Sequence, residues 1–156
     1  EQSYGYIDGD SASLAELCCL ISALTRTPIK QTFAVTGSIN QYGEVQAIGG
    51  VNEKIEGFFR LCQARGLNGD HGVIIPAVNK RNLMLKQEVI TAVEQGLFSI
   101  YVVATVDETL ALLTDKSVGI IDKDGNYPEG SLNFKAISRL KEISDLAADD
   151  DKEDAL

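Results

Sequence analysis

The order of apolar and polar positions predicts that short strands and helices alternate along this chain. Apolar residues fill nearly every position from Leu14 to Leu24, which is typical of a helix buried on most of its faces. Short apolar runs bounded by turn residues predict strands in "QTFAV", "GVIIP" and "FSIYVV". A second helix is predicted where apolar residues recur at three- and four-residue intervals, at Val51, Ile55, Phe58, Phe59 and Cys62.

The remaining segments complete an α+β chain. "SINQYGEVQAI" predicts a hairpin, because Gly43 suits its tight turn, and Gly49 and Gly50 then break the strand. Helices are predicted in "QEVITAVEQG", "VDETLALLTD" and "SLNFKAISRLKEI", with the turn-rich loop "DKDGNYPEG" before the last of them. Residues 146–156 carry like charges and little apolar surface, so we predict a disordered acidic tail there.

Composition and charge exclude several classes of partner. The 156 residues, 44% of them apolar, are typical of one globular domain. The formal net charge of −9, with no basic cluster, argues against binding to nucleic acid or to an anionic membrane surface. The sequence has neither an apolar run of roughly eighteen residues nor a secretion signal. We therefore expect a soluble protein without a membrane partner, located in the cytoplasm.

The cysteines fit the same compartment. Cys18, Cys19 and Cys62 occupy apolar positions of predicted helices, and their odd number argues against a disulfide framework. They also lack the CxxC spacing of a metal or redox site. We expect all three to be small buried apolar residues of a protein in a reducing environment.

The stretch "IDGDSASLAE" admits two interpretations. Ser13 and Glu16 have the spacing of a capping box, which would only secure the start of a helix. Alternatively, Ser11 is a nucleophile, because a serine at a helix N-terminus lies beside unpaired backbone N–H groups and the positive end of the helix dipole. The same donors could stabilise an oxyanion.

A nucleophilic serine needs a base, and the chain offers two candidates. His71 is the only histidine, and its loop position "NGDHG" is more typical of a solvated side chain. Lys54 lies between Phe58 and Leu61 on the circumference of the second helix, within its apolar arc. Desolvation there would lower the pKa of a lysine and make it a usable base. A lysine that extends its ammonium group to water from the rim is the open alternative.

Together, "GDSAS" and "GGVNEK" resemble the proteolytic domain of Lon, the ATP-dependent protease, in its B-type branch. The serine and the lysine of these motifs are 43 residues apart, as in that family. "AVTGSIN" is similar to the family's A-x-T-G segment, and "PAVNKRNL" is similar to its P-x-x-N-K-R-x-L run. The resemblance extends from about Gly9 to Leu113, and "YPEGSLN" onward resembles the C-terminal extension of bacterial B-type relatives.

The resemblance implies a role for each matching residue. It places Ser11 as the nucleophile and Lys54 as the general base and later the acid. Thr36 matches the threonine that supports the lysine, Asp10 matches the B-type aspartate before the serine, and Asp8 lies where many relatives carry an acid. The implied fold is the Lon-type α+β fold, which is ribosomal protein S5 domain 2-like.

The resemblance also implies the organisation of the whole protein. Only ten residues precede Ser11, so we expect residues 1–145 to be the C-terminal part of a proteolytic domain, with an extension from about residue 117. The chain has no G-x-x-x-x-G-K-[ST] loop, so we expect no cofactor or metal in it. ATP and Mg²⁺ would bind the ATPase module of the full-length protein, which would be a homohexameric ring.

Two hypotheses of function follow. In the first, the chain is a Ser-Lys endopeptidase domain that hydrolyses peptide bonds in protein substrates, without a metal. In the second, it is a catalytically idle or self-inhibited assembly module. The acids near the serine support the second hypothesis, because a carboxylate beside Lys54 would stabilise its ammonium form and weaken it as a base.

Overall fold

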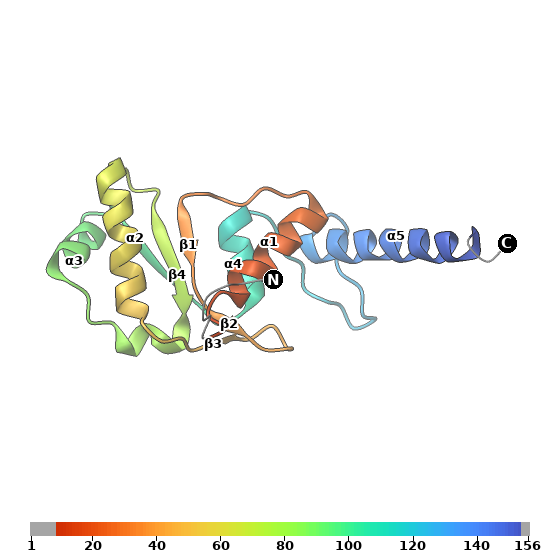
Figure 1. Ribbon diagram of the computed structural model, residues 1–156, viewed down its shortest axis with the longest axis horizontal. Coiled ribbons are helices and arrows are strands. Elements are labelled where there is room, and N and C mark those ends of the chain that lie inside the picture. Colours follow the sequence, from red (N-terminus) through yellow and green to blue (C-terminus); the bar gives the residue numbers. More distant parts are fainter. Residues whose placement is uncertain (1–8, 154–156) are drawn as a thin grey trace.

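A three-stranded parallel sheet separates two groups of helices (Figure 1). The computed structural model describes residues 9–153. The strands have the order β1-β4-β5 and comprise Phe33–Val35, Gly72–Pro76 and Ser99–Val103. Both neighbouring pairs run parallel, and parallel strands need crossover connections of the kind that helices provide. All three strands confirm the prediction from the short apolar runs.

The central strand β4 supplies apolar side chains to both faces of the sheet. Val73, Ile74 and Ile75 are almost completely buried. Ile74 belongs to an apolar cluster with residues of α1 and α4, whereas Val73 and Ile75 belong to a second cluster with residues of α2 and α3. Because successive side chains of a strand point to opposite faces, an uninterrupted apolar run is what a strand covered on both sides requires.

The helices confirm the positions predicted from apolar periodicity. One side of the sheet carries α2 (Val51–Arg65) and α3 (Gln87–Glu94), and the other carries α1 (Ser13–Thr25) and α4 (Val106–Thr114) (Figure 1). A short 3₁₀ helix, η1 (Ala77–Asn82), follows β4 and was not foreseen in the pattern.

A small hairpin lies beside the start of α1. Its strands β2 (Ser38–Ile39) and β3 (Val45–Gln46) pair antiparallel. Gly43 in the turn has a φ of +76°, a left-handed conformation that glycine adopts without strain. The predicted hairpin and the role of its glycine are therefore confirmed.

The last helix is longer than the sequence predicts. Helix α5 (Leu132–Glu153) packs its first turns against α1 and then extends away from the body of the chain (Figure 1). It continues through residues 146–153, where we predicted a disordered tail. The lack of a buried face does not end the helix, because an existing helix gains one backbone hydrogen bond for each residue added. Ala147 and Ala148 also have the highest helix propensity. Residues 154–156 lie outside the described part.

The cysteines correct one expectation of burial. Cys18 and Cys62 are buried, as expected, but Cys19 is exposed on α1. Adjacent residues of a helix lie about 100° apart, so Cys18 and Cys19 cannot both face the same core. Among the described helices, none is both long and apolar enough to cross a membrane.

Burial predicts unequal thiol reactivity. Desolvation, and secondarily the neighbouring Cys19, raises the pKa of Cys18 to about 12, and desolvation also raises the pKa of Cys62. The thiolate is the reactive form, so an alkylating reagent at mildly alkaline pH should modify Cys19 first. Cys18 and Cys62 should react only as the chain opens. Peptide mass spectrometry over time measures the three rates, and equal rates for all three cysteines would contradict this packing.

Candidate active site

Ser11 lies in a turn directly before α1. The helix begins at Ser13, and Ala12 occupies its N-cap position, where no side chain makes a capping hydrogen bond. The expected capping box of Ser13 and Glu16 is therefore wrong, because Ser13 is already the first helical residue. Its hydroxyl oxygen instead accepts a hydrogen bond from the backbone N–H of Ile39, at 3.1 Å.

Besides the bond from the hydroxyl of Thr36 to the carbonyl oxygen of Ser11, four hydrogen bonds between the segment after β1 and this turn hold the turn in place. The backbone N–H of Gly37 donates to the carbonyl oxygen of Ser11 at 2.9 Å, and that of Leu14 donates to the carbonyl oxygen of Gly37 at 3.1 Å. The bond from Ile39 to Ser13 is the third. In the fourth, the hydroxyl of Ser38 donates to Oδ2 of Asp10 at 2.5 Å.

Gly37 is required for this close approach. A Cβ atom at this position would lie 2.8 Å from Cδ2 of Leu14 and 3.1 Å from Cγ1 of Val45. Leu14 is fully buried and cannot easily move aside. The absence of a side chain at Gly37 therefore allows the turn at Ser11 to pack directly on the end of β1.

The first turn of α2 brings Lys54 to Ser11. The Nζ atom of Lys54 lies 2.8 Å from Oγ of Ser11 and 3.3 Å from Oγ1 of Thr36. Thr36 follows β1, and its buried hydroxyl also donates to the carbonyl oxygen of Ser11 at 3.3 Å. The structure thus brings Ser11, Lys54 and Thr36 together from three separate segments of the chain.

The start of α2 is itself fixed by glycine and asparagine. Gly50 precedes the helix with a φ of +65°, which a side chain would strain. Asn79 is buried in η1, and its amide group both accepts from the backbone N–H of Ile48 and donates to its carbonyl oxygen, each at 3.0 Å. Asn79 is the asparagine of "PAVNKRNL", and its role is not visible in the sequence because its partner Ile48 lies 31 residues away.

The structure places Lys54 at the rim of the apolar face of α2. Lys54 is exposed, Phe58 is half-buried and Leu61 is 48% exposed, so this part of the apolar arc lies at the rim of α2. Hydrogen bonds to the two hydroxyl groups hold the amine, rather than enclosure in an apolar core. Of the two alternatives left open by the sequence, the rim position is the correct one.

The other candidate residues lie apart from the amine or outside the described part. The carboxylate of Asp10 bonds to Ser38, and no salt bridge between Asp10 and Lys54 occurs among the described residues. Asp8 falls among the residues that are not described. His71 is half-buried at the start of β4 and is not part of the cleft at Ser11.

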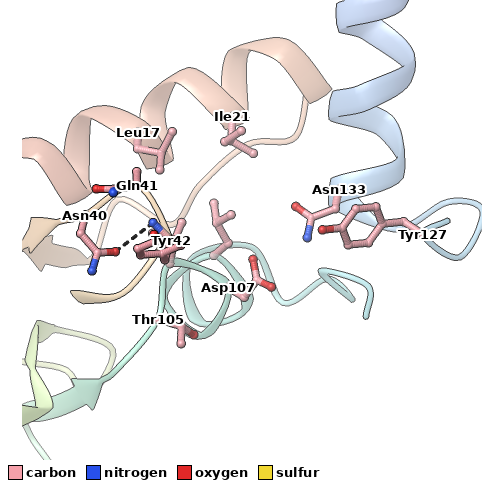
Figure 2. A pocket seen from close by; sticks show the side chains of 12 residues that line it. Leu17, Ile21, Asn40, Gln41, Tyr42, Thr105, Asp107, Tyr127 and Asn133 are labelled. Atoms are coloured by element: carbon pink, nitrogen blue, oxygen red, sulfur yellow. Dashed lines mark hydrogen bonds between the residues drawn. The ribbon is translucent and has the colours of Figure 1, made fainter. Parts of the chain in front are cut away.

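A cleft of about 330 Å³ opens beside Ser11 and Lys54. Apart from the two hydroxyl groups and the amine, its lining consists of small apolar residues, which are Ala12, Ala15, Ala34, Val35 and Val73. A larger hollow of about 600 Å³ lies between α1, the hairpin turn and the starts of α4 and α5 (Figure 2). The described residues that line it include no Ser, Cys, Lys or His, so it does not repeat the pairing of a serine with an amine.

Comparison with known proteins agrees with this geometry. Residues 6–115 match the model of the Lon protease (S16) C-terminal proteolytic domain family. A Lon protease homolog of Escherichia coli (strain K12) is 57% identical over 113 residues, which are 72% of this chain and 19% of that protein. A Lon protease homolog of Haemophilus influenzae is 49% identical over 140 residues, which are 90% of this chain and 22% of that protein.

More distant relatives include an archaeal Lon protease of Methanocaldococcus jannaschii. It is 44% identical over 114 residues, which are 73% of this chain and 15% of that protein. The chain thus spans about a fifth or less of the length of these relatives. The family match covers α1, the sheet and all three residues gathered at the cleft. The chain belongs to the Lon protease C-terminal proteolytic domain family.

Proposed function

We propose that this chain carries the peptide-bond-hydrolysing site of a Lon-like serine endopeptidase, of the B-type branch, and has the Lon-type, ribosomal protein S5 domain 2-like fold. The observation that carries the proposal is the 2.8 Å separation of Ser11 Oγ and Lys54 Nζ. A serine hydroxyl is a weak nucleophile without a base within hydrogen-bond reach, and this distance lies within that reach.

In the first half of the reaction, Ser11 Oγ attacks the carbonyl carbon of the scissile peptide bond while its proton passes to the neutral amine of Lys54. The carbonyl oxygen becomes an oxyanion. The backbone N–H groups of Ser11 and Ala12 make no backbone hydrogen bonds within the described part of the chain and lie at the positive end of α1. They are the candidate donors to the oxyanion. Lys54 then gives its proton to the departing amine, leaving an acyl-enzyme.

In the second half, water replaces the departed amine. Lys54, neutral again, takes a proton from the water as its oxygen attacks the acyl carbon. Collapse of the second tetrahedral intermediate returns the proton to Ser11 Oγ and releases the carboxylic acid. In both halves of the reaction Thr36 keeps the amine directed toward Ser11, because its hydroxyl contacts both Lys54 Nζ and the carbonyl oxygen of Ser11. We assign it the role of orienting the base.

The contacts favour this proposal over an idle or self-inhibited assembly module. Self-inhibition would require a carboxylate on the amine of Lys54, whereas the carboxylate of Asp10 is bonded to Ser38. The amine is bonded to Ser11 and Thr36 instead. The cleft beside them is open, and its small apolar lining leaves room for a side chain of a peptide substrate.

The setting of the whole protein is part of the proposal. The family resemblance supports an ATP-dependent homohexamer that acts on protein substrates. The net charge of −9 supports a segment without a nucleic-acid or membrane partner, and the cysteine content supports a cytoplasmic protein. Among the described residues, no group of three or more His, Cys, Asp or Glu side chains could hold a metal ion. The chain also lacks a phosphate-binding loop, so its residues do not fit Mg²⁺ and ATP. We assign them to a separate ATPase module.

Ser11 and Lys54 form the proposed catalytic dyad, and loss of either side chain should abolish hydrolysis. In the complete protein, Ser11→Ala should reduce turnover of an unstructured protein substrate to background. Lys54→Ala should reduce it by roughly 10²- to 10⁴-fold, the usual contribution of a general base. Unchanged thermal unfolding of both variants would show that the fold is intact. Near-normal turnover by Lys54→Ala would mean that another group is the base.

The hydroxyl group of Thr36 should contribute more to kcat than the volume of its side chain. Thr36→Val keeps the volume but loses the bond to Lys54, and we expect roughly a tenfold to hundredfold lower kcat, from the usual contribution of a hydrogen bond to a charged group. The control is Thr36→Ser, which keeps the hydroxyl and should remain within a few-fold of the original chain. If the serine and valine variants were equally slow, the threonine would act through packing alone.

A further inference from the structure

The carboxylate of Asp10 has a partner that the family motifs do not explain. The hydroxyl of Ser38 donates to its Oδ2 atom at 2.5 Å. Ser38 is only 2% exposed, whereas Asp10 itself is exposed. A hydrogen bond between a hydroxyl and a carboxylate is among the stronger kinds, and its buried donor is shielded from competing water. Ser38 therefore fixes one oxygen of an exposed carboxylate.

The position of Ser38 is fixed by the surrounding backbone. Ser38 lies in β2 and pairs with Gln46 of β3. The residues on both sides of it bond to the turn at Ser11, because Gly37 donates to Ser11 and Ile39 donates to Ser13. Its hydroxyl is thus carried by a backbone that cannot shift without disturbing the turn.

A free carboxylate at Asp10 would lie close to the dyad. Consecutive Cα atoms are about 3.8 Å apart, so Asp10 is anchored immediately beside Ser11. Lys54 Nζ lies 2.8 Å from the hydroxyl of Ser11. A carboxylate released from Ser38 could rotate toward this amine. It would then stabilise the ammonium form, which cannot accept the proton of Ser11.

Among the described residues, no other acid is placed to pair with the amine of Lys54 in the same way. Of the residues in the described part that line the cleft, Lys54 is the only one with an acidic or basic side chain. On α2, Glu56 pairs with Lys86 at 3.2 Å, and Glu53 lies near Gly50. Asp10, bonded in the turn at Ser11, is the described acid whose release would change the surroundings of the amine most directly.

We propose that Ser38 is a positioning residue of the active site, which holds the carboxylate of Asp10 away from Lys54 and leaves the amine to Ser11. The inference deepens the proposed function and rests on it. It assigns to Asp10 a held state, in which the dyad is intact, and a released state, in which an ion pair blocks it. Ser38 sets the balance between these two states through a single hydroxyl.

A double-variant cycle in the complete protein tests this role with a serine-reactive fluorophosphonate probe. Ser38→Ala removes only the donor, and the rate of Ser11 labelling should fall about tenfold, as one charge contact stabilises the ammonium form. Asp10→Asn should label within a few-fold of the original chain, because an amide oxygen can still accept from Ser38. The combined Ser38→Ala and Asp10→Asn variant should recover most of the lost rate, because residue 10 then carries no charge that could stabilise the ammonium form of Lys54.

The recovery separates positioning from a structural role. If Ser38 only stabilised the turn, the second substitution would leave the rate as low or lower. An unchanged rate in Ser38→Ala, or no recovery in the combined variant, would overturn the role of Ser38. Absence of labelling in the original chain would instead contradict the proposed function.

Discussion

The hydrogen bonds between residues 10–14 and residues 36–39 determine where the nucleophile lies. Ser11 is not part of a regular element, so its position depends on the backbone that its turn contacts. Gly37 both donates to and accepts from that turn, and its neighbours Thr36, Ser38 and Ile39 add three hydrogen bonds that involve a side chain. Packing of Leu14 beside Ile74 fixes the start of α1 on the sheet, and these hydrogen bonds fix the turn before it, so together they maintain the 2.8 Å between Ser11 Oγ and Lys54 Nζ.

The sheet extends this positioning to the base. The backbone N–H of Thr36 donates to the carbonyl oxygen of Ile74, so the end of β1 is fixed to the buried central strand. Val73 and Ile75 on the other face of β4 share an apolar cluster with α2, whose first turn carries Lys54. The nucleophile and the base thus come from opposite sides of one sheet and meet at its edge. Asn79, which follows β4 in η1, fixes the backbone just before α2.

Local sequence patterns predict the elements of this structure but not the contacts between them. The strand "GVIIP" and the helix from Leu14 to Leu24 were predictable because burial on several faces leaves a simple apolar pattern. The pairing of Ser11 with Lys54 came from family motifs. The partners of Asp10, Ser13 and Asn79 lie 28, 26 and 31 residues away, and no local pattern marks them. Periodicity also placed Lys54 on an apolar arc, but it could not show where that arc ends at the rim.

The central claim is that Lys54 activates Ser11 in the site as folded, and one rate measures this most directly. The second-order rate of Ser11 phosphonylation by a fluorophosphonate can be compared between the original chain and Lys54→Met, which keeps a long side chain but has no amine. The account predicts a rate lower by roughly 10²-fold or more in the variant, the loss expected when a general base is removed. Equal rates in the two chains would contradict it.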